Sequence, residues 1–267
     1  MPAEALALAL AAAFLHAGWN VLLRGSADVA ARTVAVLCWS VVLFAPAAAA
    51  TWRVSGAAVP YVAASAAAEG VYFVLLVAAY RRRELSVVYP VARGSAPALV
   101  LAGTAVVLGR AVSSAEIAGV LLVAAGVALV RGLRRGAEGI GVGLAIGLAI
   151  AAYTLIDKEG LRHAAPIPYL ELVLAPLALL ALLARPSALR TQRSWSTVGA
   201  AVGSFGAYVL FLFALRLTAA PGVAAVRETS VVIGAALAAL FLKEHVSWPR
   251  FAGAAAVAGG VAILAVA

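Results

Sequence analysis

The chain has 267 residues, of which 65% are hydrophobic and 12% are charged, and its formal net charge is +9. This composition excludes an ordinary soluble globular protein and indicates a polytopic membrane protein. Because nearly all the basic residues lie in short loops between apolar segments, the positive charge indicates contact with the membrane surface and not with nucleic acid.

Ten apolar segments follow one another along the chain, each near the roughly 20 residues that a helix needs to cross a bilayer. They cover residues 5–23, 33–51, 59–80, 86–108, 116–131, 139–157, 167–184, 195–215, 221–242 and 248–266. The loops between them leave no room for a soluble domain. The predicted fold class is an all-α polytopic membrane protein with ten transmembrane helices.

The second half of the chain repeats the first when 134 is added to each residue number. This offset aligns Arg93 with Arg227 without a gap, and it also aligns Gly119 with Gly253, Gly126 with Gly260 and Trp19 with Tyr153. Five spans per half is an odd number, so the second half must enter the membrane from the opposite side. We predict two inverted five-helix repeats, residues 1–133 and 134–267, around a central cavity.

Lysines and arginines are divided unequally between the two ends of the predicted bundle. Thirteen lie in or beside the odd-numbered loops, against five in or beside the even-numbered loops. Cytoplasmic loops are enriched in these residues. We therefore predict that the odd-numbered loops are cytoplasmic and that both termini lie on the other side of the cell (inner) membrane.

The sixth predicted span opens with Gly139, Gly143 and Gly147 at four-residue spacing. Such a strip is typical of a helix that another helix approaches closely. Glycines recur in the fifth and tenth spans. At all these positions we predict tight packing and not contact with a ligand.

Cysteine and histidine are too sparse for a disulfide or a metal site. Cys38 is the one cysteine of the sequence, and the three histidines lie far apart along it. A single thiol cannot form an intramolecular disulfide, and the histidine spacing fits no zinc motif. We therefore expect neither a metal nor another cofactor.

Polar and aromatic side chains inside the predicted spans are the candidate functional residues, because ionisable groups inside a bilayer are costly and usually functional. They are His16, Trp19, Asn20, Glu69, Tyr72, Tyr89, Arg93, Tyr153, Thr154, Tyr208, Arg227, Glu228 and Thr229. A straight helical rise puts Arg93 nearer the cytoplasmic mouth, Arg227 nearer the outer mouth and Glu69 near the midplane. Alternatively, the arginines extend to the surface, and hydroxyl side chains bond their own helix backbone.

Several short motifs resemble the drug/metabolite transporter superfamily, specifically its EamA-like ten-helix members. The motifs are His16–Asn20, Tyr89–Pro97, Ala152–Lys158, Arg227–Ser230 and Leu242–Ser247, the last being similar to a Gly-Glu loop signature of the family. The first half departs from that signature, with Gly109-Arg110 at the corresponding place. The resemblance implies two five-helix halves around a central cavity and transport by alternating access.

These observations predict a secondary transporter for a small polar or amphipathic metabolite, acting as an exporter and present as a monomer or homodimer. An arginine would bind an anionic group of the substrate, and aromatic residues would stack on it or bond to it. The predicted substrate-binding residues are Trp19, Asn20, Tyr72, Tyr89, Arg93, Tyr153, Thr154, Tyr208, Arg227, Glu228 and Thr229. The alternatives are an integral-membrane enzyme acting on a lipid, and a non-transporting membrane scaffold.

His16 and Glu69 are predicted to couple transport to protons. Neither has an ionisable equivalent in the second half, where the matching residues are Ile150 and Gly203. Residues that break the repeat are candidates for what is specific to this chain. The alternative is a permanent ion pair between Glu69 and Arg93 that holds two helices together.

Cysteine labelling tests the predicted orientation. In a Cys38→Ala background, a single cysteine replacing Arg81, Arg82 or Arg83 is expected to resist an impermeant thiol reagent added to intact cells, because that loop is predicted to be cytoplasmic. Labelling is measured as a shift in mass, with permeabilised cells as the positive control. Ready labelling in intact cells would overturn the orientation.

Overall fold

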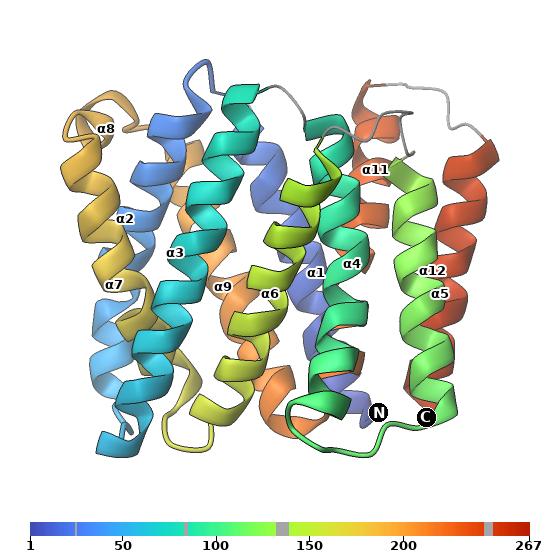
Figure 1. Ribbon diagram of the computed structural model, residues 1–267. Coiled ribbons are helices and arrows are strands. Elements are labelled where there is room, and N and C mark those ends of the chain that lie inside the picture. Colours follow the sequence, from blue (N-terminus) through green and yellow to red (C-terminus); the bar gives the residue numbers. More distant parts are fainter. Residues whose placement is uncertain (25, 83–84, 132–138, 243–247) are drawn as a thin grey trace.

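The computed structural model describes residues 1–24, 26–82, 85–131, 139–242 and 248–267, which form a bundle of helices (Figure 1). The long helices are α1 (Ala3–Arg24), α2 (Val29–Ala50), α3 (Val59–Arg82), α4 (Leu85–Val106), α5 (Ser114–Arg131), α6 (Ile140–Gly160), α7 (Pro166–Ala184), α9 (Trp195–Leu217), α10 (Ala220–Arg227), α11 (Thr229–Leu242) and α12 (Trp248–Val266). Two short helical turns, η1 (Gly56–Ala58) and α8 (Ala188–Thr191), lie in loops.

The prediction of ten helical spans is confirmed. Within the described ranges, eight helical segments are long and apolar enough to cross a membrane, and two shorter apolar stretches, Val91–Val106 and Ser114–Val130, complete the set. The ninth span differs in detail, because it consists of α10 and α11 separated at Glu228. At this break the Thr229 hydroxyl donates to the Val226 carbonyl at 2.8 Å, a local bond that competes with the helical ladder.

Three features singled out in the sequence lie wholly or partly outside the described residues. They are the predicted boundary between residues 133 and 134, residues 243–247 of the loop motif, and residues 83–84 of the arginine-rich loop. The two halves are therefore compared through their helices.

The two halves run through the bundle in opposite directions. Figure 1 shows that α1 begins at the end that holds both termini, whereas α6 begins at the opposite end. The packing partners also correspond: α1 packs on α9 as α6 packs on α3, and α4 packs on α6 as α10 and α11 pack on α1. This is the arrangement of an inverted repeat related by a pseudo-two-fold axis in the membrane plane.

Two glycine contacts between α5 and α12 obey this symmetry. A Cβ atom at Gly126 would lie 2.7 Å from the Gly253 carbonyl oxygen, and one at Gly119 would lie 3.1 Å from the Gly260 carbonyl oxygen. The offset of 134 exchanges the two contacts, because it carries Gly119 to Gly253 and Gly126 to Gly260. At these points the two backbones approach so closely that there is no room for a side chain.

A second glycine strip brings α6 against α4, the helix that carries Arg93. A Cβ atom at Gly143 would lie 3.0 Å from a backbone oxygen of α4, and one at Gly147 would lie 3.2 Å from another. The packing role predicted for both glycines is therefore confirmed. Gly139 instead precedes α6 with a φ of 90°, a conformation that glycine adopts without strain.

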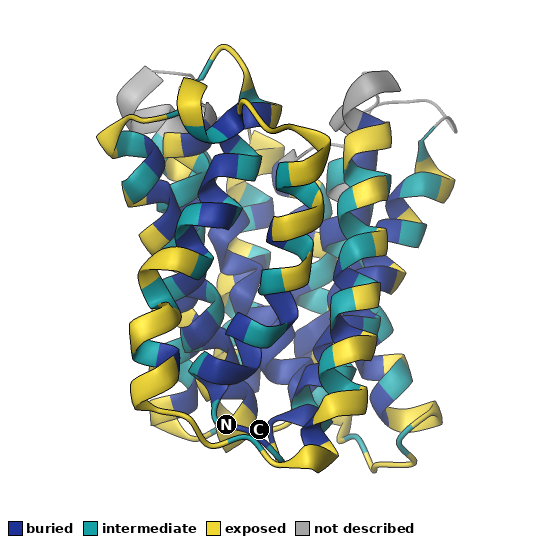
Figure 2. Cartoon of the chain, turned by 90° about the vertical axis from the view of Figure 1, so that its left-hand side faces the viewer, coloured by how far each residue is buried: buried dark blue, intermediate teal, exposed yellow. Residues whose placement is uncertain are grey.

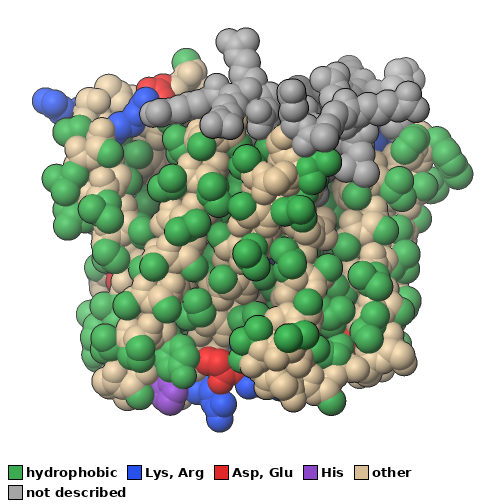
Figure 3. All heavy atoms as spheres, viewed as in Figure 1, with side chains coloured by type: hydrophobic (Ala, Val, Ile, Leu, Met, Phe, Trp, Pro, Cys, Tyr) green, Lys and Arg blue, Asp and Glu red, His purple; other side chains and the backbone are tan. Residues whose placement is uncertain are grey.

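Burial increases from the outside of the bundle toward its middle (Figure 2). The outer surface between the two ends is mainly hydrophobic, and the visible charged side chains gather at the ends (Figure 3). Apolar residues such as Val74 and Leu183 are 70% and 67% exposed. A helix surface of this kind is stable in contact with lipid tails.

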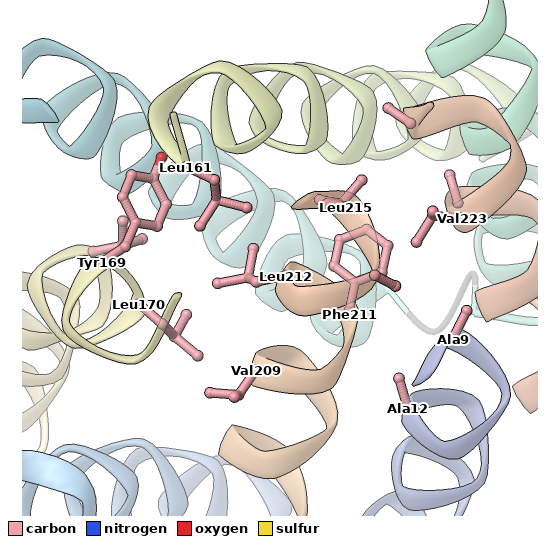
Figure 4. Packing of buried hydrophobic residues seen from close by; sticks show 14 of the residues in the cluster. Ala9, Ala12, Leu161, Tyr169, Leu170, Val209, Phe211, Leu212, Leu215 and Val223 are labelled. Atoms are coloured by element: carbon pink, nitrogen blue, oxygen red, sulfur yellow. The ribbon is translucent and has the colours of Figure 1, made fainter. Parts of the chain in front are cut away.

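The largest buried apolar cluster packs α7 against α9 and reaches α1 and α10 (Figure 4). Tyr169, Leu170, Phe211, Leu212 and Leu215 form much of it, and each is fully buried. Because Tyr169 and Phe211 also contact polar groups described below, this cluster fixes one side of the candidate site.

Gly126→Ala is expected to lower the free energy of unfolding by about 1–3 kcal/mol, because the new Cβ would meet the backbone of α12 at Gly253 and Val257, as well as the Val257 side chain. Gly234→Ala in α11 is the matched control, since a Cβ there meets nothing within 4 Å. Alanine is the better helix former, so the control should be as stable as the parent or more stable. Thermal unfolding in detergent measures both variants, and equal midpoints would contradict the close packing.

Candidate substrate-binding site

An ion pair at the centre of the bundle joins the two halves. Arg93 of α4 donates from Nη1 to Oε1 of Glu228, between α10 and α11, at 3.1 Å. The two residues are 7% and 1% exposed. Inside a membrane protein a pair of this kind neutralises two charges that would each be costly alone.

This pair corrects the depths expected from the sequence. The sequence places Arg93 near one mouth and Arg227 near the other, yet Glu228, the neighbour of Arg227, forms an ion pair with Arg93. Counting helical rise gives the depth of the backbone, whereas the charged ends lie several bonds away and extend toward the centre. Arg93 and Arg227 therefore belong to one central polar layer and not to two separate gates.

His16 of α1 contacts the same guanidinium from the other side. Its Nε2 lies 2.7 Å from Arg93 Nη2. A guanidinium only donates, so Nε2 must accept, and the neutral imidazole carries its proton on Nδ1. The Trp19 indole nitrogen, 3.4 Å from Nδ1, is also only a donor, so this second contact is at most weak. His16 thus acts here as an acceptor that orients Arg93.

Arg227 lies in the same layer but has a different environment. It is 6% exposed, its Cζ lies 4.1 Å from the centroid of the Phe211 ring, and it interacts with Tyr153. Within the part of the chain that the structure describes, no ion pair joins Arg227 to a carboxylate, and its Nε has no hydrogen-bond partner. A cation–π contact stabilises a guanidinium but does not neutralise it.

Asp157 of α6 accepts three hydroxyl hydrogen bonds. Ser65 and Tyr169 donate to Oδ1, the latter at 2.9 Å, and Tyr208 donates to Oδ2 at 2.8 Å. The residue is 0% exposed. The sequence had suggested that Asp157 lies at the end of a span beside a loop, but α6 continues to Gly160 and carries the carboxylate into the protein interior.

Glu69 of α3 lies beside this network and not beside Arg93. Its carboxyl group is 4% exposed and interacts with Tyr208, Asp157 and Arg227. Among the described residues Glu69 Oε1 has no hydrogen-bond partner. The alternative of a permanent pair between Glu69 and Arg93 is therefore wrong, because Glu228 occupies that position.

The predicted tyrosines form an aromatic wall around the charged groups. The Tyr153 ring centroid lies 6.3 Å from that of Tyr72 and 6.2 Å from that of Tyr208. Arg93 lies 5.6 Å from the centroid of the Tyr89 ring. Tyr72, Tyr89 and Arg93 also line a narrow recess of about 10 Å³, which has room for about one water molecule. The centre of the bundle is thus closed at this recess.

Three other predicted residues contribute less to this centre. The Asn20 amide donates to its own helix at the His16 carbonyl, at 2.7 Å. Thr229 likewise bonds its own backbone, as described above. Thr154 is fully buried, and its hydroxyl has no partner among the described residues. Asn20 and Thr229 thus follow the alternative of backbone bonding, and only Thr154 keeps a hydroxyl free for another group.

A wider basic recess opens at the end of the bundle that carries the termini. Its volume is about 410 Å³, and its lining includes Arg53, Arg162, Arg216 and His163. Arg162 is partly neutralised by Glu159, 3.0 Å away. A concave surface lined by arginines attracts small anions from solution.

Comparison with known proteins identifies the second half of the chain. The EamA-like transporter family matches residues 137–266. The chain contains an EamA-like transporter domain. This domain supplies Asp157, Tyr208, Arg227 and Glu228, and the resemblance inferred from the sequence motifs is confirmed for it.

A solved structure supports the same fold over the whole chain. A protein crystal structure with 16% sequence identity superposes with a TM-score of 0.79, covering 98% of this chain and 96% of the other. At this identity the likeness concerns the fold alone. No curated protein sequence matches the chain. The EamA-like domain therefore assigns the chain to membrane transport, and the details of its function rest on its own residues.

Sequence reasoning missed four residues that line the centre of the transporter. Asp157 bonds the predicted Tyr208 and Phe211 contacts the predicted Arg227, whereas Ser65 and Tyr169 bond Asp157. Asp157 lies within the motif Ala152–Lys158 and is the last residue of the predicted span 139–157, so a span extended to Gly160 would have placed it inside the membrane. The other three have no such signal, because a serine or an aromatic residue inside an apolar span is common.

Glu228→Gln is expected to lower the free energy of unfolding by about 3–5 kcal/mol, because it leaves the buried charge of Arg93 without its counter-ion. Glu159→Gln is the control, since it removes an ion pair with Arg110 that is partly exposed and contributes about 0–1 kcal/mol. Chemical unfolding in detergent measures both. A loss for Glu228→Gln no larger than that of the control would contradict a stabilising central pair.

Proposed function

We propose that the chain is a secondary transporter for a small organic metabolite that carries a negatively charged group, such as a carboxylate or phosphate. The observation that supports this most directly is Arg227, a buried guanidinium with a free Nε and no carboxylate ion pair in the described part of the chain. A carboxylate or phosphate on the substrate would match the planar fork of this side chain.

The distribution of charge supports an anionic substrate over a cationic one. Arg93 pairs directly with Glu228, whereas Arg227 forms no direct ion pair with a carboxylate in the described part of the chain and interacts with Asp157 and Glu69 only at longer range. A bound anion would give this buried guanidinium the direct partner that it lacks. The arginines of the basic recess near the termini would attract the same class of molecule before it reaches the centre.

The aromatic wall supports an organic anion over an inorganic ion. Tyr72, Tyr153 and Tyr208 follow one another around the centre, and Trp19 lies on α1 nearby. Aromatic side chains offer apolar area for stacking together with hydroxyl or indole groups for hydrogen bonds. The proposed substrate thus has an apolar or aromatic part beside its charged group.

Alternating access follows from the inverted halves. In this mechanism one half rocks against the other around a fixed central site, so that the site opens to one side of the membrane at a time. The Arg93–Glu228 pair joins the halves, and His16 orients it, so we assign His16 to positioning and not to proton transfer. Export and the orientation of the termini stay predictions, as does the oligomeric state.

A non-transporting scaffold and a lipid-modifying enzyme, the two alternatives to a transporter, would each behave differently from a transporter in reconstituted vesicles. A non-transporting scaffold moves no solute, and a lipid-modifying enzyme changes its substrate chemically. A screen of carboxylate- and phosphate-bearing metabolites by thermal stabilisation would identify a ligand, since binding to the folded state raises its stability. Unchanged ligand accumulating inside proteoliposomes would then support transport over both alternatives.

Arg227→Lys is expected to weaken binding of the ligand found in this screen by about 10–100-fold, because it replaces a bidentate charge-assisted contact worth about 1.5–3 kcal/mol. Its effect on the stability of the ligand-free protein should be small, since the positive charge remains. The measurement is ligand-dependent thermal stabilisation together with flux into proteoliposomes.

Arg110→Lys is the matched control, because its guanidinium pairs with Glu159 at the partly exposed end of the bundle. It should bind and transport like the parent. If Arg227→Lys also does so, the guanidinium does not hold the substrate, and the proposal of an anionic substrate at Arg227 fails.

A further inference from the structure

We propose that the basic recess at the end of the bundle that carries the termini is a second binding site, which takes a phosphate group, and that a phosphate bound there holds the two halves of the chain together at this end. Inorganic phosphate, a phosphorylated metabolite and the headgroup of an acidic phospholipid share this chemistry. The site is separate from Arg227, and only its effect on opening rests on the proposed transport function.

The recess lies across the boundary between the two halves. Residues 53–55 of the first half line it together with residues 161–165 and Arg216 of the second half. The two loops are joined by an antiparallel bridge between Val54 and Ala164, with backbone hydrogen bonds of 2.7 and 3.0 Å on either side of it. A ligand in the recess therefore contacts both halves at once.

The positive charge of the recess is largely without a counter-charge from the protein. Among the described residues, the lining holds three arginines and a histidine and no acidic side chain. Within the described ranges Arg53 and Arg216 form no ion pair. Arg162 bonds Glu159, but the same carboxylate also accepts from Arg110. Arg53 and the two arginines of the second half therefore repel each other across the boundary.

Contacts outside the recess hold the groups that line it. Lys158 of α6 donates to two carbonyl groups at the end of α9, one of them that of Thr218 at 2.9 Å, and so fixes the turn that carries Arg216. The His163 ring stacks on Tyr61 of α3, with 5.6 Å between the ring centroids. A site that is formed in advance loses less conformational entropy when a ligand binds.

The opposite end of the bundle shows what the recess lacks. There Asp28, which precedes α2, accepts two hydrogen bonds from Arg185 at 3.0 and 3.1 Å and joins a loop of the first half to a loop of the second. The offset of 134 carries Asp28 to Arg162. The corresponding loops at the terminal end thus present a cation where a carboxylate joins the halves at the other end. A bound anion supplies the missing negative charge.

The size and the position of the recess favour a phosphate group. Its volume of about 410 Å³ falls within the roughly 300–1,000 Å³ of small-molecule sites. Guanidinium groups bind phosphate oxygens through pairs of parallel hydrogen bonds. The recess lies where α6 and α9 end, and Trp52 beside it is 53% exposed, as is typical of the membrane–water interface. The phosphate can therefore come from solution or from a lipid headgroup.

A phosphate in this recess would oppose opening of the bundle at this end. Alternating access separates the two halves at one end at a time. Arg53 moves with the first half, whereas Arg162 and Arg216 move with the second. The anion keeps all three contacts only while the loops are joined, so it favours the closed form by the difference between its two affinities.

Inorganic phosphate and purified full-length protein in detergent test the site. Phosphate is expected to raise the midpoint of thermal unfolding in a saturable manner, with chloride of equal ionic strength as the reference. Arg53→Gln and Arg216→Gln, one from each half, should each weaken phosphate binding by about tenfold or more, because each removes a charge-assisted contact. Arg190→Gln is the control, since Arg190 lies on α8 at the opposite end and has no ion pair among the described residues.

Phosphate also stabilises proteins in general through its exclusion from their surfaces, and that effect would be the same in every variant. Equal stabilisation of the parent and of both recess variants therefore overturns the soluble source. A phosphate response that is lost in Arg227→Lys but kept in the recess variants would place the anion at the centre, and the recess proposal would fail. A response kept in Arg227→Lys and lost in the recess variants supports the recess, whatever the outcome at the centre.

Vesicles of phosphatidylcholine with and without phosphatidylglycerol separate the two sources. Stabilisation by phosphatidylglycerol that requires Arg53 and Arg216, without a response to soluble phosphate, identifies a lipid headgroup. A response to inorganic phosphate or glycerol phosphate that requires the same arginines identifies a dissolved ligand. If neither source gives a stabilisation that depends on these arginines, the recess is not a phosphate site.

Thiol labelling tests the effect on opening. Ala58 of η1 is fully buried in the cluster that includes Ala164 and Tyr169 of the second half, and it does not line the recess. In a Cys38→Ala background, Ala58→Cys should react only when the halves separate at this end. Phosphate, or phosphatidylglycerol if that is the source, at about ten times its Kd is expected to slow the reaction about tenfold. The slowing should be absent with Arg53→Gln, and unfolded protein is the positive control. Binding that leaves the labelling rate unchanged would overturn the effect on opening.

Discussion

The ion pair between Arg93 and Glu228 is the interaction on which the centre of this protein depends. It forms at 3.1 Å between the first and second halves of the chain, and both residues are buried. Neither charge would be stable alone at this depth, so the pair requires the two halves to meet in one register. His16 completes the constraint by accepting from the same guanidinium at 2.7 Å. Once these three side chains are in place, the position of Arg227 is fixed as well, because Arg227 directly precedes Glu228 in the chain.

Small residues make this meeting possible. Gly143 and Gly147 let α6 approach the backbone of α4, and this contact brings Tyr153 of α6 close to Arg93. At the far side of the bundle, α5 and α12 are joined by glycines that obey the repeat symmetry. In lipid there is little hydrophobic driving force between helices, so close packing and buried polar contacts hold the bundle together. The glycines provide the close packing, and the central charged residues provide the buried polar contacts.

The fold was more predictable from the sequence than the site. Ten spans follow from hydropathy, and inversion follows from an odd number of spans per repeat, so both depend only on the order of apolar segments. The site depends on where side chains end, which a helical rise does not describe. This is why Arg93 and Arg227 were placed at different depths, although Glu228, which follows Arg227, touches Arg93. Asp157 was placed near a loop for a related reason, since the end of a helix is uncertain by several residues.

The repeat explains why one arginine has no directly bonded carboxylate. Arg93 and Arg227 occupy equivalent positions, but Glu228, the partner of Arg93, corresponds to Gly94 in the first half. The other ionisable groups of the centre break the symmetry as well, because Asp157 corresponds to Leu23 and Glu69 to Gly203. A symmetric scaffold thus provides two cations, and the asymmetric substitutions provide a directly bonded carboxylate for Arg93 and more distant carboxyl groups for Arg227. The lack of a direct ion pair at Arg227 is a consequence of that difference between the halves. Loss of symmetry in a duplicated protein can therefore give two equivalent arginines different environments, with no change in how the helices pack.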